Sequence, residues 1–230
     1  MILETVNSLK KMLNEANVQN IVFEVADPIH REKFKDIQEE FSVEIDEQIK
    51  KVYASFNGLR VKWEYESANT KKDSGPVEGS VRILKFQDMM IGFDGHMWRN
   101  ELWMDNMKKD TLGFYQRLKP FDYYATEAVQ CVCVEMTSDR KLTANLWIYD
   151  QGYEPLRLNI TLEDYFIMLL KSKGIWGWQF FYTNINLAEK KNKIVRDNCK
   201  FIIDNYGKIF NDGFEKELVT IFEKLQKGKS

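Results

Sequence analysis

Histidine and cysteine are the residue types most able to do chemistry near neutral pH, as metal ligands, bases or nucleophiles. The chain has two histidines, His30 and His96, and three cysteines. Cys131 and Cys133 are two residues apart in a strand-like segment, so their thiols are expected on one face of a strand. A zinc site needs three or four protein ligands, and no CxxC motif or nearby histidine supplies the others. We expect no metal site here and interpret both thiols as small core groups.

A second candidate for chemistry is the segment Asp94-Gly95-His96, where a carboxylate and an imidazole share a turn. Such a pair is catalytic only with a nucleophile or substrate in hydrogen-bond reach, and no motif in the chain supplies one. The alternative is a turn that is stabilised by local hydrogen bonds of the histidine. We therefore expect no catalytic residue. Glycine-rich phosphate-binding motifs are also missing from the sequence, so no cofactor is expected.

Acidic residues are concentrated between positions 20 and 50, where nine acidic and four basic residues give a local net charge of −5. One interpretation is a face that mimics nucleic acid and attracts a basic protein partner. The other is two ordinary solvated helix faces, since exposed charge is the default. The first interpretation assigns partner contacts to Glu39, Glu40, Glu44 and Glu47, which we call the acidic set.

A block rich in tryptophan and methionine follows later, around Trp98 and Trp103. Exposed on the surface, it would make an adaptable contact with a partner, because methionine repacks easily and tryptophan contributes large contact area. Buried, the same block is part of the core. Trp98 and Trp103 therefore join the acidic set as candidate partner-binding residues.

The amino-acid composition indicates which kind of protein this is. The 230 residues are 44% hydrophobic and 30% charged, which is typical of a folded globular chain, and the net charge is −2. A near-neutral charge argues against a general nucleic-acid binder. No segment resembles a signal peptide or is apolar for long enough to cross a bilayer. With three cysteines and no disulfide spacing, we expect a cytoplasmic protein with neither nucleic acid nor membrane as partner.

The elements that position these residues can be predicted from hydrophobic periodicity. Helical spacing predicts helices over about 3–17, after Asp27-Pro28, and over 45–56, where Asn57-Gly58 ends the helix. Alternation then predicts a strand through Val61, Trp63 and Tyr65, a polar loop over 68–79, and a second strand through Val81 and Ile83 that extends to Phe86.

Later segments predict a strand pair and further helices. Two strands are predicted over 128–136 and 143–149, joined by the turn Ser138-Asp139-Arg140. A helix begins after Thr161, with Asp164 in the capping-box position, and ends at Gly174. Beyond residue 186 the pattern is helical only, with Ile194, Phe201 and Ile202 assigned to one face of a helix and a second stripe from Phe214 to Leu225. The fold class expected is α+β, with a mainly antiparallel sheet flanked by helices and a C-terminal helical extension.

The order helix, Asn57-Gly58, strand, followed by paired strands and a closing helix with Gly174 and Gly177-Trp178-Gln179 after it, resembles the SUKH superfamily. This family includes a fungal cell-wall synthesis regulator and many bacterial immunity proteins. The resemblance divides the chain into a SUKH-like α+β domain over 1–185 and a helical extension over 186–230 that packs on the same domain.

The resemblance implies a binding protein rather than an enzyme. Bacterial members are similar to antitoxins that bind a secreted polymorphic toxin, often a nuclease, and so protect the producing cell. The expected partner is thus a protein, most simply a toxin domain, with no small-molecule substrate. Two alternatives stay open: a regulatory or scaffold protein in signalling or cell-wall control, and an uncharacterised hydrolase centred on Asp94 and His96.

Overall fold

The computed structural model describes residues 2–16, 18–65, 77–91, 108–125, 130–150 and 154–228. Its described residues form two compact units. The first takes its residues from 1–24, 60–81 and 156–230, and the second from 25–59 and 82–155. Three strands, β1, β3 and β4, contain a boundary between the units.

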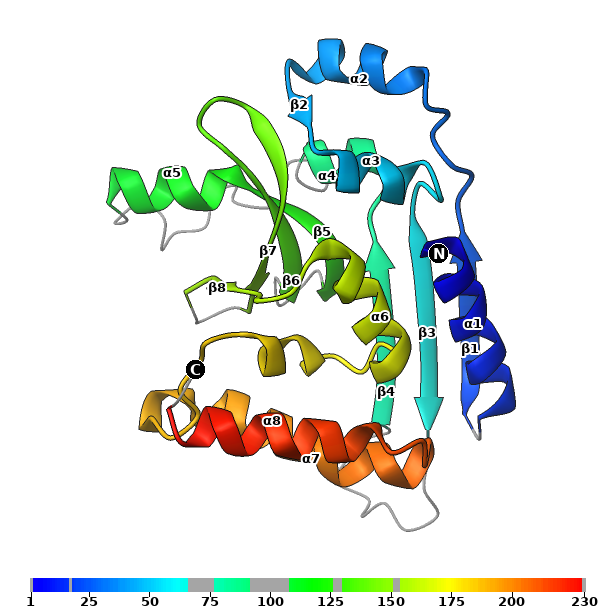
Figure 1. Cartoon of the computed structure of the whole chain (residues 1–230), viewed down its shortest axis with the longest axis vertical. Coiled ribbons are helices and arrows are strands. Elements are labelled where there is room, and N and C mark those ends of the chain that lie inside the picture. The colour runs from blue at the N-terminus through cyan, green and yellow to red at the C-terminus, as the bar shows by residue number, and fades with distance from the viewer. Residues whose placement is uncertain are drawn as a thin grey trace. The chain divides into compact units, whose positions relative to one another are not determined.

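The first unit combines a small group of strands with helices from both ends of the chain (Figure 1). Its elements are α1 (Ile2–Glu15), β1 (Gln19–Val25), β3 (Leu59–Tyr65), β4 (Val77–Ile83), β8 (Leu156–Arg157), α6 (Leu162–Ser172), the 3-10 turns Trp178–Tyr182 and Lys190–Asn192, α7 (Lys193–Ile209) and α8 (Phe214–Gln226). The strand order is β1-β3-β4. Helix α1 packs against α6, and α7 packs against α8.

Trp63 belongs to the first unit and has no solvent exposure. Its indole Nε1 donates a hydrogen bond of 2.7 Å to the backbone carbonyl of Lys173, just beyond α6. Gly79 on β4 faces the indole ring, because a Cβ at position 79 would lie 2.2 Å from Nε1 of Trp63. Strand and helix therefore meet here through one buried aromatic side chain.

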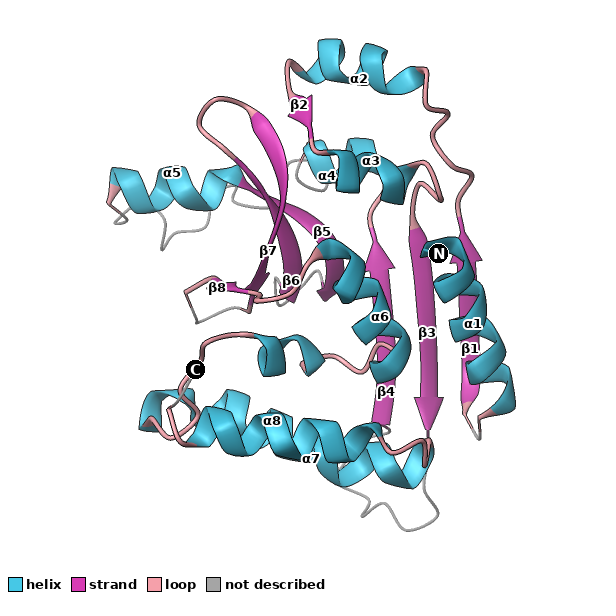
Figure 2. Ribbon diagram, in the orientation of Figure 1, coloured by secondary structure: helices cyan, strands magenta, loops and turns pink. Residues whose placement is uncertain are grey.

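The second unit contains strands β5, β6, β7 and β2 with shorter helices (Figure 2). Its elements are α2 (Lys33–Phe41), β2 (Glu44–Ile45), α3 (Glu47–Tyr53), α4 (Phe86–Met90), α5 (Lys109–Arg117), β5 (Leu118–Ala125), β6 (Gln130–Met136) and β7 (Lys141–Tyr149). Strands β5, β6 and β7 pair antiparallel, and β2 adds to β7 in parallel. The predicted α+β class with mainly antiparallel strands and C-terminal helices is confirmed.

The junction after α3 is held by the asparagine and glycine that the sequence singled out. Gly58 has a φ of +122°, a conformation that residues with a Cβ rarely adopt. The side-chain Oδ1 of Asn57 accepts a hydrogen bond of 2.8 Å from the backbone N–H of Phe86. That bond caps the start of α4, so the prediction that Phe86 extends a strand is wrong.

Two further predictions need correction. Ile45 belongs to β2, not to the helical stripe, and lies opposite Leu142 of β7. On α7 the predicted face is wrong for Ile194 and Phe201, which are 72% and 43% exposed, and right for Ile202, which is buried. The residues that α7 buries are Val195, Cys199, Ile202, Tyr206 and Ile209.

Apart from the two-residue strands β2 and β8, two strands were not predicted. Strand β1 (Gln19–Val25) falls between predicted helices, and β5 (Leu118–Ala125) follows α5 without a turn. Pro120 lies within β5 beside an irregularity in its register with β6. Proline cannot donate to a strand ladder and usually argues against a strand, which explains why the alternation was not recognised.

Candidate functional site

The acidic set lies on three consecutive elements of the second unit. Glu39 and Glu40 are on α2, Glu44 is on β2 and Glu47 is in the first turn of α3, and all four are exposed. Trp98 and Trp103 lie outside the described residues, as do Asp94 and His96. The structure thus places the four carboxylates that were predicted as partner contacts, all exposed, on consecutive elements of one unit.

The segment that carries the acidic set is held by hydrogen bonds from the β6–β7 turn and from α2. Arg140 has a φ of +64°, and its guanidinium donates to the backbone carbonyls of Ser42 and Phe41 at the end of α2. The Oε1 atom of Gln38 accepts from the N–H of Ile45 at 3.1 Å. These bonds connect α2, β2 and the β6–β7 turn around one short stretch of chain.

Lysines accompany three of the four carboxylates. Glu39 lies 3.9 Å from Lys35, Glu44 lies 3.0 Å from Lys141 and Glu47 lies 2.8 Å from Lys50. Exposed ion pairs of this kind contribute only about 0–1 kcal/mol, so they leave the carboxylates able to exchange partners. The face therefore carries mixed charge rather than the purely acidic surface that the local count suggested.

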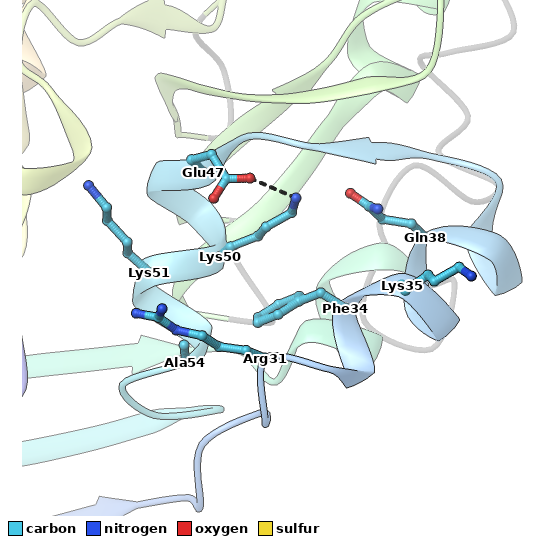
Figure 3. A pocket seen from close by; sticks show the side chains of 8 residues that line it. All are labelled: Arg31, Phe34, Lys35, Gln38, Glu47, Lys50, Lys51 and Ala54. Carbon is cyan, nitrogen blue, oxygen red and sulfur yellow. Dashed lines mark hydrogen bonds and ion pairs between the residues drawn. The ribbon is translucent and has the colours of Figure 1, made fainter.

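A pocket opens between α2 and α3, with a volume of about 430 Å³ (Figure 3). Half of its lining residues are cationic. The residues are Arg31, Phe34, Lys35, Gln38, Glu47, Lys50, Lys51 and Ala54. Of the acidic set only Glu47 belongs to the lining, and the pKa of its carboxyl is lowered by the hydrogen bond and charge of Lys50, with Lys51 and Arg31 adding to the effect. We call this cavity the α2–α3 pocket.

The α2–α3 pocket was not predicted from the sequence. Counting charges along residues 20–50 gives an acidic total, whereas the fold gathers cations from two helices on one cavity. The available signal was the spacing of Arg31, Lys35 and Gln38, at intervals of four and three, which is the spacing of one helix face.

The cysteines and His30 have no reactive surroundings. The thiols of Cys131 and Cys133 lie 3.6 Å apart and are both buried. Burial, together with the neighbouring Cys133, raises the pKa of Cys131 well above its ordinary value, and burial raises that of Cys199 to about 12. His30 is exposed. Within the described residues, no group of three potential ligands could hold a metal ion.

Lys173 forms a buried polar cluster in the first unit that sequence reasoning missed. Its side chain is 2% exposed, and its Nζ donates to Asp212 at 2.7 Å and to the Tyr206 hydroxyl at 2.8 Å. The ammonium also lies 5.3 Å from the ring centre of Phe210. Burial lowers the pKa of Lys173 despite the opposing effect of Asp212. Because Lys173 and Tyr206 are buried and the polar groups of the cluster bond to one another, we interpret it as structural.

A scan against protein-family models, a search of curated proteins and a search of solved structures each found no match. None of the helices in the described ranges is both long enough and apolar enough to span a bilayer.

Proposed function

We propose that this chain is a non-enzymatic binding protein that contacts a protein partner through the exposed surface of α2, β2 and α3. The observation that carries the proposal is the acidic set, whose four carboxylates are exposed on three consecutive elements of one compact unit. Three of the four carboxylates are in exposed and therefore weak ion pairs with lysines, so a basic partner can take the place of these lysines when it binds.

The proposed partner is a secreted toxin domain, and binding would cover its active or substrate-binding surface. The resemblance to immunity proteins is the reason for this choice. The order on which that resemblance depends, helix, Asn57-Gly58 and strand, is present as α3, a turn with a positive φ at Gly58, and β3. A nuclease toxin suits the charge, because a nuclease must present a basic surface to its substrate.

The first experiment is capture of partners from the secreted proteins of the source organism and its neighbours, with the full chain as bait. We expect one toxin domain, and we expect co-expression of this chain to restore growth of cells that produce that toxin. Failure of the folded bait to retain any toxin domain, or of co-expression to restore growth, overturns the proposal.

The contact surface is tested with a matched pair of charge-reversed variants. The first variant changes Glu39, Glu40, Glu44 and Glu47 to Lys. The control changes four exposed acids of the first unit to Lys: Glu189, Asp197, Asp204 and Glu223. We expect the first variant to lose at least 100-fold in affinity and the control to keep the affinity within a few-fold. Equal loss in both variants would mean that net charge, and not this surface, determines binding.

A further inference from the structure

The α2–α3 pocket carries an excess of positive charge that the protein itself does not neutralise. Four cations line it, against the single carboxylate of Glu47. Lys50 is paired with that carboxylate, and Lys35 lies near Glu39. No ion pair involves the side chain of Arg31 or Lys51 within the described part of the chain. The pocket lining therefore has a net charge of +3.

The cations of the pocket are close enough to influence the same group. Arg31 precedes α2 and Lys51 lies on α3, yet both lower the pKa of the same carboxyl, that of Glu47. In Figure 3, Arg31 and Lys51 lie on one side of Phe34, with the Lys51 side chain extending outward, and Gln38 lies on the other side. A ligand between the two helices would thus meet a guanidinium and ammonium groups from different directions, which is the arrangement that binds clustered oxyanions most strongly.

Gln38 adds a neutral donor to the pocket. Its Oε1 is engaged by the backbone N–H of Ile45, so its Nε2 amide group is the end that remains for a ligand. Apart from Glu47, the polar side-chain groups that the pocket offers are donors. Such a set suits an acceptor-rich ligand and disfavours a cation or a ligand with many hydroxyl donors.

The size of the cavity selects among anions. A volume of about 430 Å³ lies within the range of small-molecule sites, roughly 300–1,000 Å³. Phe34 and Ala54 supply an apolar part of the wall. We propose that the α2–α3 pocket binds a small organic oxyanion with at least two negative charges, a phosphate ester or a polycarboxylate, between Arg31, Lys51 and Gln38. Such a ligand would be bound rather than converted, and the proposal does not depend on the toxin-binding function.

Calorimetric titration of the purified full chain tests the proposal, with inorganic pyrophosphate and citrate as separate probes at constant ionic strength. Saturable one-to-one binding of either probe supports it, and the tighter probe identifies the ligand as a phosphate or a carboxylate. Absence of saturable binding of both probes up to 5 mM, roughly the upper edge of ordinary metabolite affinities, overturns it.

Two single variants of the pocket are expected to change affinity in opposite directions. Gln38→Glu keeps an oxygen for the N–H of Ile45 but replaces the amide donor with a negative charge, so affinity should fall at least tenfold. Glu47→Gln removes the only carboxylate and frees Lys50, so affinity should rise severalfold. A purely structural role of either residue does not produce this pair of opposite shifts.

The double variant Arg31→Gln/Lys51→Gln removes the two unpaired cations, and we expect at least a tenfold loss of affinity. Its control is Lys208→Gln/Lys216→Gln, which removes two exposed charges from α7 and α8 of the first unit. Equal weakening in both doubles, or unchanged binding in the pocket variant, places the anion elsewhere and overturns the proposal. Because no protein partner is present, failure here is distinct from failure of the toxin-binding proposal.

Discussion

Lys173 places an ammonium group inside the first unit, where only contacts with fixed partners compensate for lost hydration. Asp212 supplies the carboxylate and Tyr206 a hydroxyl. Removing one member of such a pair costs more than the pair itself contributes, because the other charge stays buried.

We therefore expect Asp212→Asn to lower the free energy of unfolding by about 2–3 kcal/mol, measured by urea denaturation. The control is the double variant Lys173→Met/Asp212→Asn, which also removes the buried charge. It should be less destabilised than Asp212→Asn alone. If Asp212→Asn is as stable as wild type, the interpretation of the Lys173 cluster as structural is contradicted.

The carboxyl of Asp212 should also make the stability of the protein depend on pH. Burial acts to raise the pKa of Asp212, but the hydrogen bonds from Lys173 and from the Phe214 N–H outweigh it, so the folded value lies below the ordinary 3.8. A lowered folded pKa stabilises the protein above the unfolded value, and the stabilisation is lost as pH falls through the folded value. We would measure the free energy of unfolding of wild type and of Asp212→Asn at intervals of roughly one pH unit. The difference between them should stay constant from about pH 5 to 7 and shrink below about pH 4. A difference that grows on acidification would contradict this sign.

Replacement of Gly79 by alanine tests how tightly the core is packed around Trp63, because it adds one carbon atom there. A Cβ added at this position meets the buried indole of Trp63 at 2.2 Å, and the indole is itself fixed by its bond to Lys173. We expect Gly79→Ala to cost about 2–3 kcal/mol in thermal or urea unfolding. Gly113→Ala is the control, since its nearest neighbour there lies 3.9 Å away on the helix α5. That change should be neutral or stabilise by up to about 1 kcal/mol.

At the scale of the elements, the end of α2 depends on a residue almost a hundred positions away. Arg140 donates to two carbonyls that the helix leaves without partners, beside Ser42 at a φ of +50°. We expect Arg140→Ala to destabilise this end by about 1–3 kcal/mol, because hydrogen bonds from a charged donor are lost. Amide hydrogen exchange should therefore become faster in α2 and leave α8 unchanged.

Lys141→Ala serves as the control for that experiment. It removes the neighbouring exposed pair with Glu44, which contributes at most about 1 kcal/mol. Unequal exchange in the two variants assigns the effect to the carbonyl contacts of Arg140. Equal exchange would mean that the turn tolerates loss of these contacts.

Elements whose signals are local were predicted well. Thr161 and Asp164 form the capping box that begins α6, and the Ser138–Arg140 turn joins β6 to β7. Of the apolar stripe predicted for α8, Phe214, Leu218, Phe222 and Leu225 are buried and Ile221 is partly exposed. In each case the side chains that determine the element lie within a few residues of it, so periodicity and caps were sufficient.

Elements whose signals come from distant residues were not predicted. Phe86 begins a helix because Asn57 caps it from 29 positions away, which no local window contains. β5 contains Pro120, so its strand character depends on pairing with β6. The α2–α3 pocket is of the same kind, because its charge results from two helices brought together and not from the composition of either one.

At the scale of the whole molecule, the proposals concern the second unit and the stability tests concern mainly the first. A variant of one unit can therefore be used to ask whether the other unit is affected. A variant such as Asp212→Asn should leave anion binding at the α2–α3 pocket unchanged at temperatures below its unfolding transition. Changed affinity in that variant, measured with the same probes, would show that the two units are energetically coupled.

The chain passes between the two units four times, at residues 24/25, 59/60, 81/82 and 155/156. During synthesis on the ribosome, α1 emerges well before α6, the helix against which it packs. The second unit is complete once Pro155 has left the exit tunnel, while the first unit also needs residues 156–230. The apolar side of α1 is thus exposed until α6 emerges, a period in which chaperones would be expected to bind it.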